Sequence, residues 1–577
     1  MRKLSRRDFM KATGSGATAL GLEAGADAAR TRSAGISSLE PLWIWCEEPQ
    51  RRVFSSSTGV FKSEPQVKLA GCRGERVNTQ IAFCGQGWSG TVRVACDAVA
   101  GADARIRTAR LIPCEELDLP VPDPLEERAE IELTSGQTRA VWLDFTIPAG
   151  TKPGEYTGWL RVRAGSIERS VPLRLEVLPV TLPDPRRSGF WLSIWQDPAA
   201  IARLDGTLLW SERHWQLIRT YARNSAAHGE RTITATVVQD PWASQTGFPF
   251  PSMVTWRRDG EWTEGTSGAF RYDYTVFDRY VETFTAEGIN TIQCFSPTHD
   301  GPLAYYDERA GKMRYRKYEN GDEWWSSAWN QFLPDLIAHL KSRGWLEKTY
   351  LAMDEPSELV TEKVLSVLRR YTPDLKVYLA GGGGRYSSDA KDLVYYYFYL
   401  QEENPEIPKP DPVRRRAEGK RTSIYVCTGP THPNTFLFSP AYGSRMLPWL
   451  AWKLGYDGFV RWALNSWPAD LWEQPRYRFQ SGDNYLIYPD RNGPMDSIRW
   501  ELLFAGIQDV ECLRLAQQSL AERDHSGTSG AFLQHCRDRL AAALALATRD
   551  EDALISHRES NIGRARQALN EVLKLLA

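Results

Sequence analysis

The first third of the chain alternates apolar and polar residues in short runs. Residues 77–83 and 90–96 follow this two-residue period, which is typical of half-buried strands. Several such runs, separated by turn residues, predict a β-sandwich over residues 29–185. The proline-rich stretch 179–185 is a candidate linker to the next domain.

The pattern changes after residue 186, where apolar runs alternate with amphipathic helical segments. This order predicts parallel strands connected by helices. Eight strands spread over roughly 280 residues have the size and count of a (β/α)8 barrel, which we expect over residues 186–480. A doubly wound open sheet is the alternative. The candidate strands are residues 190–195, 232–238, 290–295, 349–353, 376–380, 393–399, 423–427 and 458–463.

The last hundred residues have helical apolar spacing, most clearly over 498–516 and 532–546. We expect residues 481–577 to form a helical segment that packs on the outside of the barrel. The predicted fold class is therefore multidomain: an N-terminal β-sandwich, an α/β (β/α)8 TIM-like barrel, and a helical C-terminal extension.

The N-terminus resembles a twin-arginine signal peptide. The run Ser5-Arg6-Arg7-Asp8-Phe9-Met10-Lys11 matches the export motif, a weakly apolar stretch follows, and Ala26-Asp27-Ala28 is a small-x-small cleavage candidate. We expect residues 1–28 to be removed and the protein to be periplasmic or secreted. The alternative is an amphipathic N-terminal helix. No later run reaches the roughly 18 apolar residues that a membrane span needs.

The composition excludes several classes of partner. The 71 basic and 72 acidic residues leave a net charge of −1, which gives no general attraction to nucleic acid. The nine cysteines and eight histidines include no CxxC or HExxH spacing, so we expect neither a metal nor an organic cofactor. The 22 tryptophans and 23 tyrosines suit stacking against sugar rings, although most must serve packing.

The strongest chemical signal is the consecutive pair Asp354-Glu355, directly after the fourth candidate strand. In a (β/α)8 barrel, chemistry takes place at the C-terminal ends of the strands. An acidic helix start, with Asp354 as the cap, is the alternative. Neighbouring strand residues point to opposite faces, so consecutive carboxyls do not easily face each other across a sugar ring. The pair therefore favours one proton donor, one supporting carboxylate, and a nucleophile that belongs to the substrate.

Ordered blocks from about residue 191 to 511 resemble glycoside hydrolase family 123. They include residues 195–198, 240–242, 252–256, 270–278, 344–355, 433–436, 458–467, 482–489 and 497–509. The resemblance implies an exo-acting β-N-acetylgalactosaminidase that retains anomeric configuration through the 2-acetamido group of its substrate. It also implies that Glu355 is the general acid/base and that Asp354 orients the acetamido group.

Polar and aromatic residues near the ends of other candidate strands are the predicted sugar contacts. The alternative for each is packing at the barrel rim. His299, in a loop after the third strand, either touches substrate or is a solvated loop residue. The predicted substrate-binding residues are Trp462, Asn465, Trp467, Asn434, Tyr396, Trp195 and Trp242.

The expected partner is thus a glycan, an oligosaccharide or a glycolipid, with terminal β-linked N-acetylgalactosamine. Two rival functions stay open at this point. One is a glycosidase of the same fold with another specificity, such as galactosamine, N-acetylglucosamine or a sugar without nitrogen. The other is a non-catalytic barrel that binds glycans.

Overall fold

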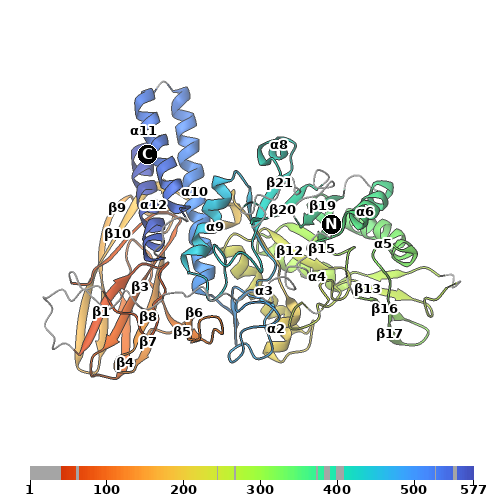
Figure 1. Ribbon diagram of the computed structural model, residues 1–577, viewed down its shortest axis with the longest axis horizontal. Coiled ribbons are helices and arrows are strands. Elements are labelled where there is room, and N and C mark those ends of the chain that lie inside the picture. The colour runs from red at the N-terminus through yellow and green to blue at the C-terminus, as the bar shows by residue number, and fades with distance from the viewer. Residues whose placement is uncertain are drawn as a thin grey trace.

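The computed structural model describes residues 41–59, 64–243, 245–264, 268–299, 301–371, 375–381, 390–397, 400, 409–526, 528–549 and 555–577. The predicted signal peptide, residues 1–28, lies outside these described residues. Figure 1 shows a sheet-rich N-terminal part beside a larger part of mixed helices and strands, with long helices at their junction.

The N-terminal part is a sandwich of two five-stranded sheets, with strand orders β1-β3-β8-β5-β6 and β2-β10-β9-β4-β7. Period-two burial explains the fold, because Leu160 and Val162 of β9 are buried while Arg161 and Arg163 between and after them are exposed. The strands are β1 (Leu42–Glu47), β2 (Val67–Arg73), β3 (Arg76–Gly85), β4 (Gly90–Cys96), β5 (Arg105–Ile112), β6 (Val121–Glu126), β7 (Glu130–Leu133), β8 (Thr138–Thr146), β9 (Gly154–Ala164) and β10 (Ile167–Thr181).

The central part is a nearly closed barrel of eight strands in the order β11-β22-β21-β20-β19-β18-β15-β12, and the seven ladder pairs are all parallel. Each of the eight predicted strands is present, and the barrel rather than the open sheet is confirmed. The strands are β11 (Trp191–Ile194), β12 (Thr232–Thr236), β15 (Thr291–Phe295), β18 (Thr349–Asp354), β19 (Lys376–Ala380), β20 (Asp392–Tyr396), β21 (Arg421–Tyr425) and β22 (Gly458–Arg461).

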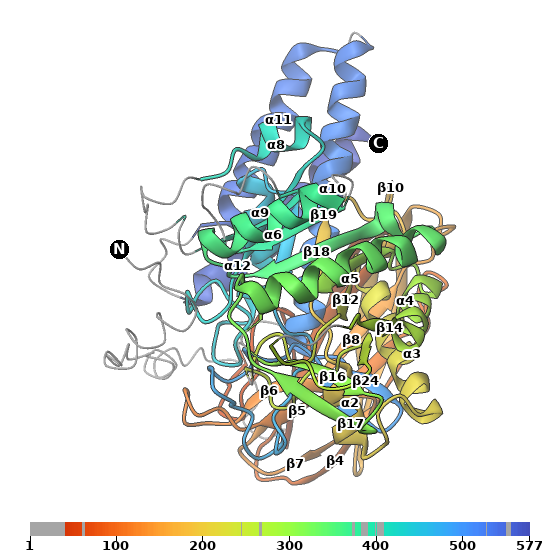
Figure 2. The same ribbon diagram turned by 90° about the vertical axis from the view of Figure 1, so that its right-hand side faces the viewer.

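Helices cover the outside of the barrel, and Figure 2 shows α5 and α6 lying over β18 and β19. Loops after β12 and β15 add a four-stranded sheet, β14-β13-β16-β17, that the sequence pattern did not predict. These elements are α2 (Pro198–Asp205), α3 (Glu212–Ala227), α4 (Thr275–Ala286), α5 (Glu323–Ser342), α6 (Glu358–Tyr371), α8 (Pro412–Ala417), α9 (Tyr442–Lys453), β13 (Thr255–Arg258), β14 (Arg271–Asp273), β16 (Leu303–Asp307), β17 (Lys312–Arg316) and the 3-10 turns η1 (Pro185–Arg187) and η2 (Leu346–Lys348).

Side chains complete the barrel where β11 meets β12, a seam at which only the bridge between Leu192 and Glu230 pairs the described backbones. The Gln196 amide accepts from the Thr234 N–H at 2.9 Å and donates to the Thr232 carbonyl at 3.1 Å. The Glu230 carboxyl accepts from the Ile194 N–H at 2.9 Å. Backbone groups that a strand ladder would pair are thus satisfied by two buried side chains.

The C-terminal part consists of α10 (Ile498–His525), α11 (Gly530–Ala547) and α12 (Ile555–Leu576), preceded by the hairpin β23 (Tyr488–Asp490) and β24 (Gly493–Met495). Helix α10 packs on barrel helix α9 and also touches β6 of the sandwich, and α12 touches β10. The helical segment therefore joins both domains at the junction seen in Figure 1, in addition to packing on the barrel.

A buried ionic network connects sandwich and barrel at this junction. Arg107 of β5 donates to Asp144 of the sandwich at 2.7 Å, and to Asp496 and Glu501 beside and within α10 at 2.8 and 2.7 Å. Arg76 of β3 adds a second cation 3.1 Å from Glu501. Burial alone would raise the pKa of Glu501, but Arg107 and Arg76 outweigh it and hold that pKa well below its usual range.

Candidate active site

Strand alternation divides the barrel side chains into two layers. Ala352 of β18 and Tyr378 of β19 belong to an interior cluster, whereas Leu351 and Leu379 of the same strands belong to the core under the helices. Asp354 is the last residue of β18 and lies in register with Ala380 of the interior cluster. The acidic pair therefore lies at the C-terminal end of the barrel.

The backbone holds the pair in a turn and not in a helix. Glu355 has φ +46°, a left-handed conformation that is uncommon for a residue with a side chain and that occurs often at functional sites. Its N–H donates to the Ala380 carbonyl at 3.1 Å. Gly381 has φ +115°, and a Cβ there would lie 3.2 Å from the Glu355 Cα, so glycine gives this turn its room.

The start of α6 shows that Asp354 is not the cap of this helix. Ser357 accepts the Val360 N–H on its hydroxyl oxygen at 3.3 Å, and its carbonyl accepts the Thr361 N–H at 2.9 Å. Ser357 therefore caps this helix. The carboxyl of Asp354 instead accepts from a tryptophan of another loop.

Each carboxyl of the pair has its own neutral hydrogen-bond donor. Trp242 Nε1 donates to Asp354 Oδ2 at 3.0 Å, and the Tyr396 hydroxyl donates to Glu355 Oε1. Both carboxyls are half-buried. Because different donors from opposite sides bind the two groups, their orientations are fixed separately.

Aromatic rings surround the pair. Trp195 stacks on Trp242 with ring centroids 5.2 Å apart, and Tyr396 lies against Tyr425 at 4.8 Å. Of the tyrosines that end β20, Tyr396 faces the interior and Tyr395 faces the helices. The sequence-predicted residues Trp195, Trp242, Tyr396 and Trp462 thus come together in one cluster. Sequence reasoning missed its other rings, Phe250, Phe295, Tyr378, Tyr425 and Phe479; the alternation of β19 and β21 was the signal for the two tyrosines.

Trp462 is held by a buried carboxylate. Its Nε1 donates to Asp483 Oδ2 at 3.0 Å, while Arg461 donates to Asp483 Oδ1 at 2.6 Å. The ring of Phe479 packs edge-on against Trp462 at 5.5 Å. One aspartate from the following loop therefore fixes the orientation of this indole.

The other three predicted sugar contacts already have backbone partners. The Asn434 amide donates to the Cys427 and Pro430 carbonyls at 2.9 and 2.7 Å. Asn465 exchanges two hydrogen bonds with the backbone of Asp197, and Trp467 donates to the Ile487 carbonyl at 2.7 Å. These fully buried residues hold the loops around the interior cluster and do not join it.

Two further titratable groups lie in loops at this end of the barrel. His299 is buried, which excludes a solvated loop histidine, and burial lowers its pKa to about 4. Asp197 caps α2 by accepting the Ala200 N–H at 3.1 Å. Burial raises the pKa of Asp197 to about 7, with a further contribution from Asp240.

Two clusters of metal-ligating side chains lie outside the interior cluster. One is Cys72, Glu75 and Cys512, and the other is His228, Asp496 and Glu501, each with ligand atoms within 4.8 Å of one another. Guanidinium groups already bind both: Arg566 lies 2.8 Å from Glu75, and Arg107 binds the second cluster. We assign both to the ionic networks between domains.

A (β/α)8 barrel with two half-buried carboxyls at its C-terminal end, beside a cluster of aromatic rings, is typical of enzymes that hydrolyse carbohydrates. The glycoside hydrolase 123 catalytic-domain model matches residues 195–516, and the glycoside hydrolase 123 N-terminal domain model matches residues 54–164. The first match covers more than half of the 577 residues. The chain therefore belongs to glycoside hydrolase family 123.

One solved structure has the same fold. A family 123 glycoside hydrolase from Clostridium perfringens, analysed for the details of glycolipid glycan hydrolysis, superposes with a TM-score of 0.79 at 21% identity, over 93% of this chain and 98% of that chain. An Ig-like-domain-containing GH10 xylanase from termite gut reaches a TM-score of 0.30 at 9% identity, over 78% and 100% of the two chains, and carries no argument. No curated protein matches the chain.

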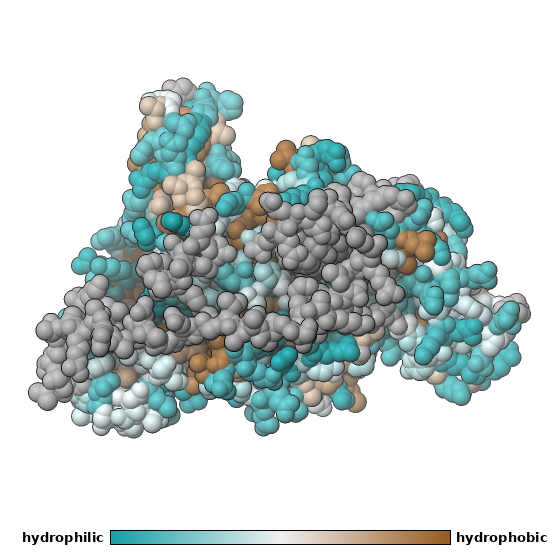
Figure 3. Space-filling view, viewed as in Figure 1, coloured by the Kyte–Doolittle hydropathy of each residue, from teal (hydrophilic) through white to brown (hydrophobic). Residues whose placement is uncertain are grey.

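The described helices include none that is long and apolar enough to span a bilayer. Hydrophilic residues predominate on the described surface visible in Figure 3, and apolar residues are scattered in small groups.

Proposed function

We propose that this protein is an exo-acting, retaining glycoside hydrolase that releases terminal β-linked N-acetylgalactosamine from oligosaccharides or glycolipids. The observation that carries the proposal is the consecutive Asp354-Glu355 pair with a separate donor on each carboxyl. A retaining pair that acts by direct attack comes from separate segments about 5 Å apart across the sugar. Adjacent carboxyls suit catalysis in which the substrate supplies the nucleophile.

The first step forms an oxazolinium ion. Glu355, protonated, gives its proton to the glycosidic oxygen as the bond to the anomeric carbon breaks, and the acetamido carbonyl oxygen forms a bond to that carbon. Asp354 accepts a hydrogen bond from the acetamido N–H and stabilises the positive charge that develops on it. The aglycone leaves with the proton of Glu355.

The second step releases the sugar. Glu355, now a carboxylate, takes a proton from water, whose oxygen attacks the anomeric carbon and opens the oxazolinium ring. Two displacements at one carbon return the original β configuration. The Tyr396 hydroxyl aligns Glu355 for both transfers, and Trp242 aligns Asp354.

The aromatic cluster is the proposed sugar subsite. Trp462, Trp195 and Tyr396 offer ring faces and edges to the C–H groups of a pyranose. We assign an indirect role to the other three residues: the hydrogen bonds of Asn434, Asn465 and Trp467 hold the loops that carry this subsite. The Clostridium perfringens enzyme, with its link to glycolipid glycans, supports a glycan of that kind as substrate here.

The cellular setting of this activity is part of the proposal. The twin-arginine motif at Arg6-Arg7 supports export in a folded state, to the periplasm or outside the cell. A fusion of residues 1–40 to a reporter that functions only after twin-arginine export tests this. Loss of export on replacing both arginines by lysine is the expected result, and export by an unrelated route would contradict it.

Glu355→Gln tests the catalytic assignment. This variant should lose hydrolysis of a poor leaving group, such as a natural disaccharide, by at least about 100-fold, because the proton donor is gone. Activated aryl glycosides should lose less. Glu358→Gln, an exposed change at the start of α6, is the matched control and should keep full activity. Equal turnover in both variants would show that Glu355 is not the proton donor.

A panel of aryl β-glycosides tests the sugar. The proposal requires cleavage of the N-acetylgalactosaminide and inhibition by the matching thiazoline, which mimics the oxazolinium ion. Cleavage of the β-galactoside alone would contradict substrate assistance. Hydrolysis of the galactosaminide, or preference for the N-acetylglucosaminide, would show that the enzyme has one of the alternative sugar specificities.

A further inference from the structure

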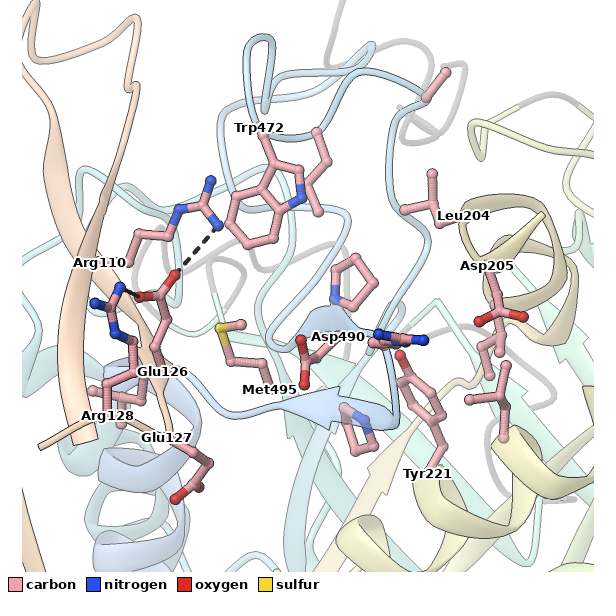
Figure 4. Close-up of a pocket in the computed structure, with 18 residues that line it drawn as sticks. Arg110, Glu126, Glu127, Arg128, Leu204, Asp205, Tyr221, Trp472, Asp490 and Met495 are labelled. Atoms are coloured by element: carbon pink, nitrogen blue, oxygen red, sulfur yellow. Dashed lines mark hydrogen bonds and ion pairs between the residues drawn. The ribbon is translucent and has the colours of Figure 1, made fainter. Parts of the chain in front are cut away.

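A second pocket lies between the sandwich and the barrel, outside the aromatic cluster of the acidic pair. Its volume is about 730 Å³, within the range of pockets that enclose small ligands. The sandwich contributes β5 and β6, the barrel contributes α2 and α3, and the hairpin β23–β24 contributes the floor. In Figure 4, Arg110 and Glu126 face Leu204 and Asp205 across the space, with Met495 between them.

The charged side chains of this pocket nearly balance one another. Three arginines stand against four carboxylates, and two of these carboxylates also bind arginines outside the pocket lining: Arg110, Arg128 and Arg491 face Glu126, Glu127, Asp205 and Asp490, with Arg105 on Glu127 and Arg213 on Asp205. The two pairs at Glu126 are long, at 3.4 Å to Arg110 and 4.0 Å to Arg128, and the Arg128 side chain is 61% exposed. Such loose, solvated pairs keep donors and acceptors for a ligand, yet they exert no strong attraction on either an anion or a cation.

The remaining lining is mostly apolar, and it lies among the charged side chains. The indole of Trp472 lies under the Arg110 guanidinium at 3.8 Å and stacks on Tyr488 with ring centroids 5.5 Å apart, so its position is fixed. In Figure 4 this indole lies on the Arg110 side of the pocket, above Met495 and across the space from Leu204. The pocket thus combines many groups that can hydrogen-bond to hydroxyls with apolar surface. Because its positive and negative side chains nearly cancel, it suits an uncharged ligand.

We propose that this pocket is an accessory glycan site, which binds a neutral oligosaccharide of two or three sugar units. Hydroxyl groups match the mixed guanidinium and carboxylate rim. The C–H groups of pyranose rings match Met495, Leu204 and the edge of Trp472, whose ring already packs against Arg110 and Tyr488. The inference rests on the proposed function in one respect, because it takes the bound glycan to be part of the substrate. A second site on the same molecule raises the effective concentration of branched or clustered glycans at the catalytic mouth.

The test uses the full-length protein and a trisaccharide that ends in thio-linked β-N-acetylgalactosamine, whose sulfur resists cleavage. Saturating N-acetylgalactosamine thiazoline blocks the catalytic mouth, and calorimetry measures what still binds. One equivalent should remain in the wild type. Leu204→Trp fills the pocket and should weaken this binding by at least about tenfold. Leu208→Trp, on the adjacent turn and 81% exposed, is the matched control and should leave it unchanged.

A second variant, Arg128→Ala, tests the pocket if the tryptophan of Leu204→Trp disturbs folding. Arg128 is exposed and its ion pair is weak, so this change should not affect folding. It should reduce binding severalfold, whereas Arg163→Ala, 70% exposed elsewhere on the sandwich, should not. No binding beside the thiazoline, or equal binding in wild type, Leu204→Trp and Arg128→Ala, overturns the accessory site. A thiazoline that fails to inhibit hydrolysis overturns the proposed mechanism instead, and the comparison of Leu204→Trp with Leu208→Trp still decides the pocket.

Discussion

At the scale of single residues, the indole of Trp242 and the hydroxyl of Tyr396 fix the orientations of the two adjacent carboxyls separately. Tyr396→Phe keeps the ring in the aromatic cluster and removes only the hydrogen bond to Glu355. A hydrogen bond to a charged group contributes about 1.5–3 kcal/mol, so kcat/KM should fall by roughly 10- to 100-fold with little change in thermal stability. Initial rates with an aryl glycoside measure this. Tyr395→Phe, on the helix-facing side of β20, should leave kcat/KM unchanged; a similar loss in both variants would argue against an alignment role.

His299 makes a prediction about pH. Its pKa is lowered from 6.5 to about 4 because the buried imidazole is desolvated. The unfolded chain binds a proton below pH 6.5 and the folded protein does not until about pH 4, so this stability is complete above pH 6.5 and is lost as the pH falls. Relative to His299→Gln, the wild type should lose about 2 kcal/mol between pH 7 and pH 5. Urea unfolding at the two pH values measures the difference.

The matched control for this titration is His525→Gln, an exposed change near the end of α10. Comparing variants cancels the opposite contribution of Asp197, whose raised pKa of about 7 favours the folded state at lower pH. Parallel pH slopes for wild type, His299→Gln and His525→Gln would show that His299 takes up its proton as readily in the folded protein as in the unfolded chain.

At the scale of elements, the barrel is closed at one seam by side chains. Gln196→Leu is close in size but leaves the Thr234 N–H and the Thr232 carbonyl without their partner. Each unsatisfied buried group costs about 1–3 kcal/mol, so the free energy of unfolding should fall by roughly 2–4 kcal/mol. Faster hydrogen exchange of the Thr234 amide should accompany the loss. Gln518→Leu, exposed on α10, should change stability by less than about 0.5 kcal/mol.

Some features of the fold and of the site follow from local sequence patterns, and others depend on contacts between distant residues. Apolar runs between amphipathic helical segments predicted all eight barrel strands, and alternation within one strand favoured the inward face of Tyr396, because both patterns lie within short segments. The bond between Trp242 and Asp354 joins residues 112 positions apart, and no local period encodes it. Likewise, Asn434 and Asn465 lie at strand ends as expected, yet their amides bind backbone carbonyls, which only the folded loops reveal. The sequence pattern also did not predict the added sheet β14-β13-β16-β17.

At the scale of the whole molecule, sandwich, barrel and C-terminal helices share a buried ionic network and one apolar cluster, while the sandwich also has a separate core of its own. Cys72 and Ile112 of the sandwich belong to the same apolar cluster as the barrel strands and α10. The predicted domain boundaries near residues 28, 185 and 480 stay predictions, but contacts of this kind make independent motion of the sandwich unfavourable.

Arg107→Met tests that coupling. The change leaves Asp144 buried without the guanidinium that binds it, whereas Asp496 keeps Arg105 at 3.1 Å and Glu501 keeps Arg76 at 3.1 Å. Removing one member of a buried ionic network costs about 3–5 kcal/mol, far more than an exposed pair. Calorimetry should show one transition for the wild type and an earlier, separate transition of the sandwich in the variant. Arg161→Met, which removes an exposed pair with Asp97 on the same sandwich, should shift stability by less than about 1 kcal/mol. A single unshifted transition in Arg107→Met would show that the apolar interface alone holds the two domains together.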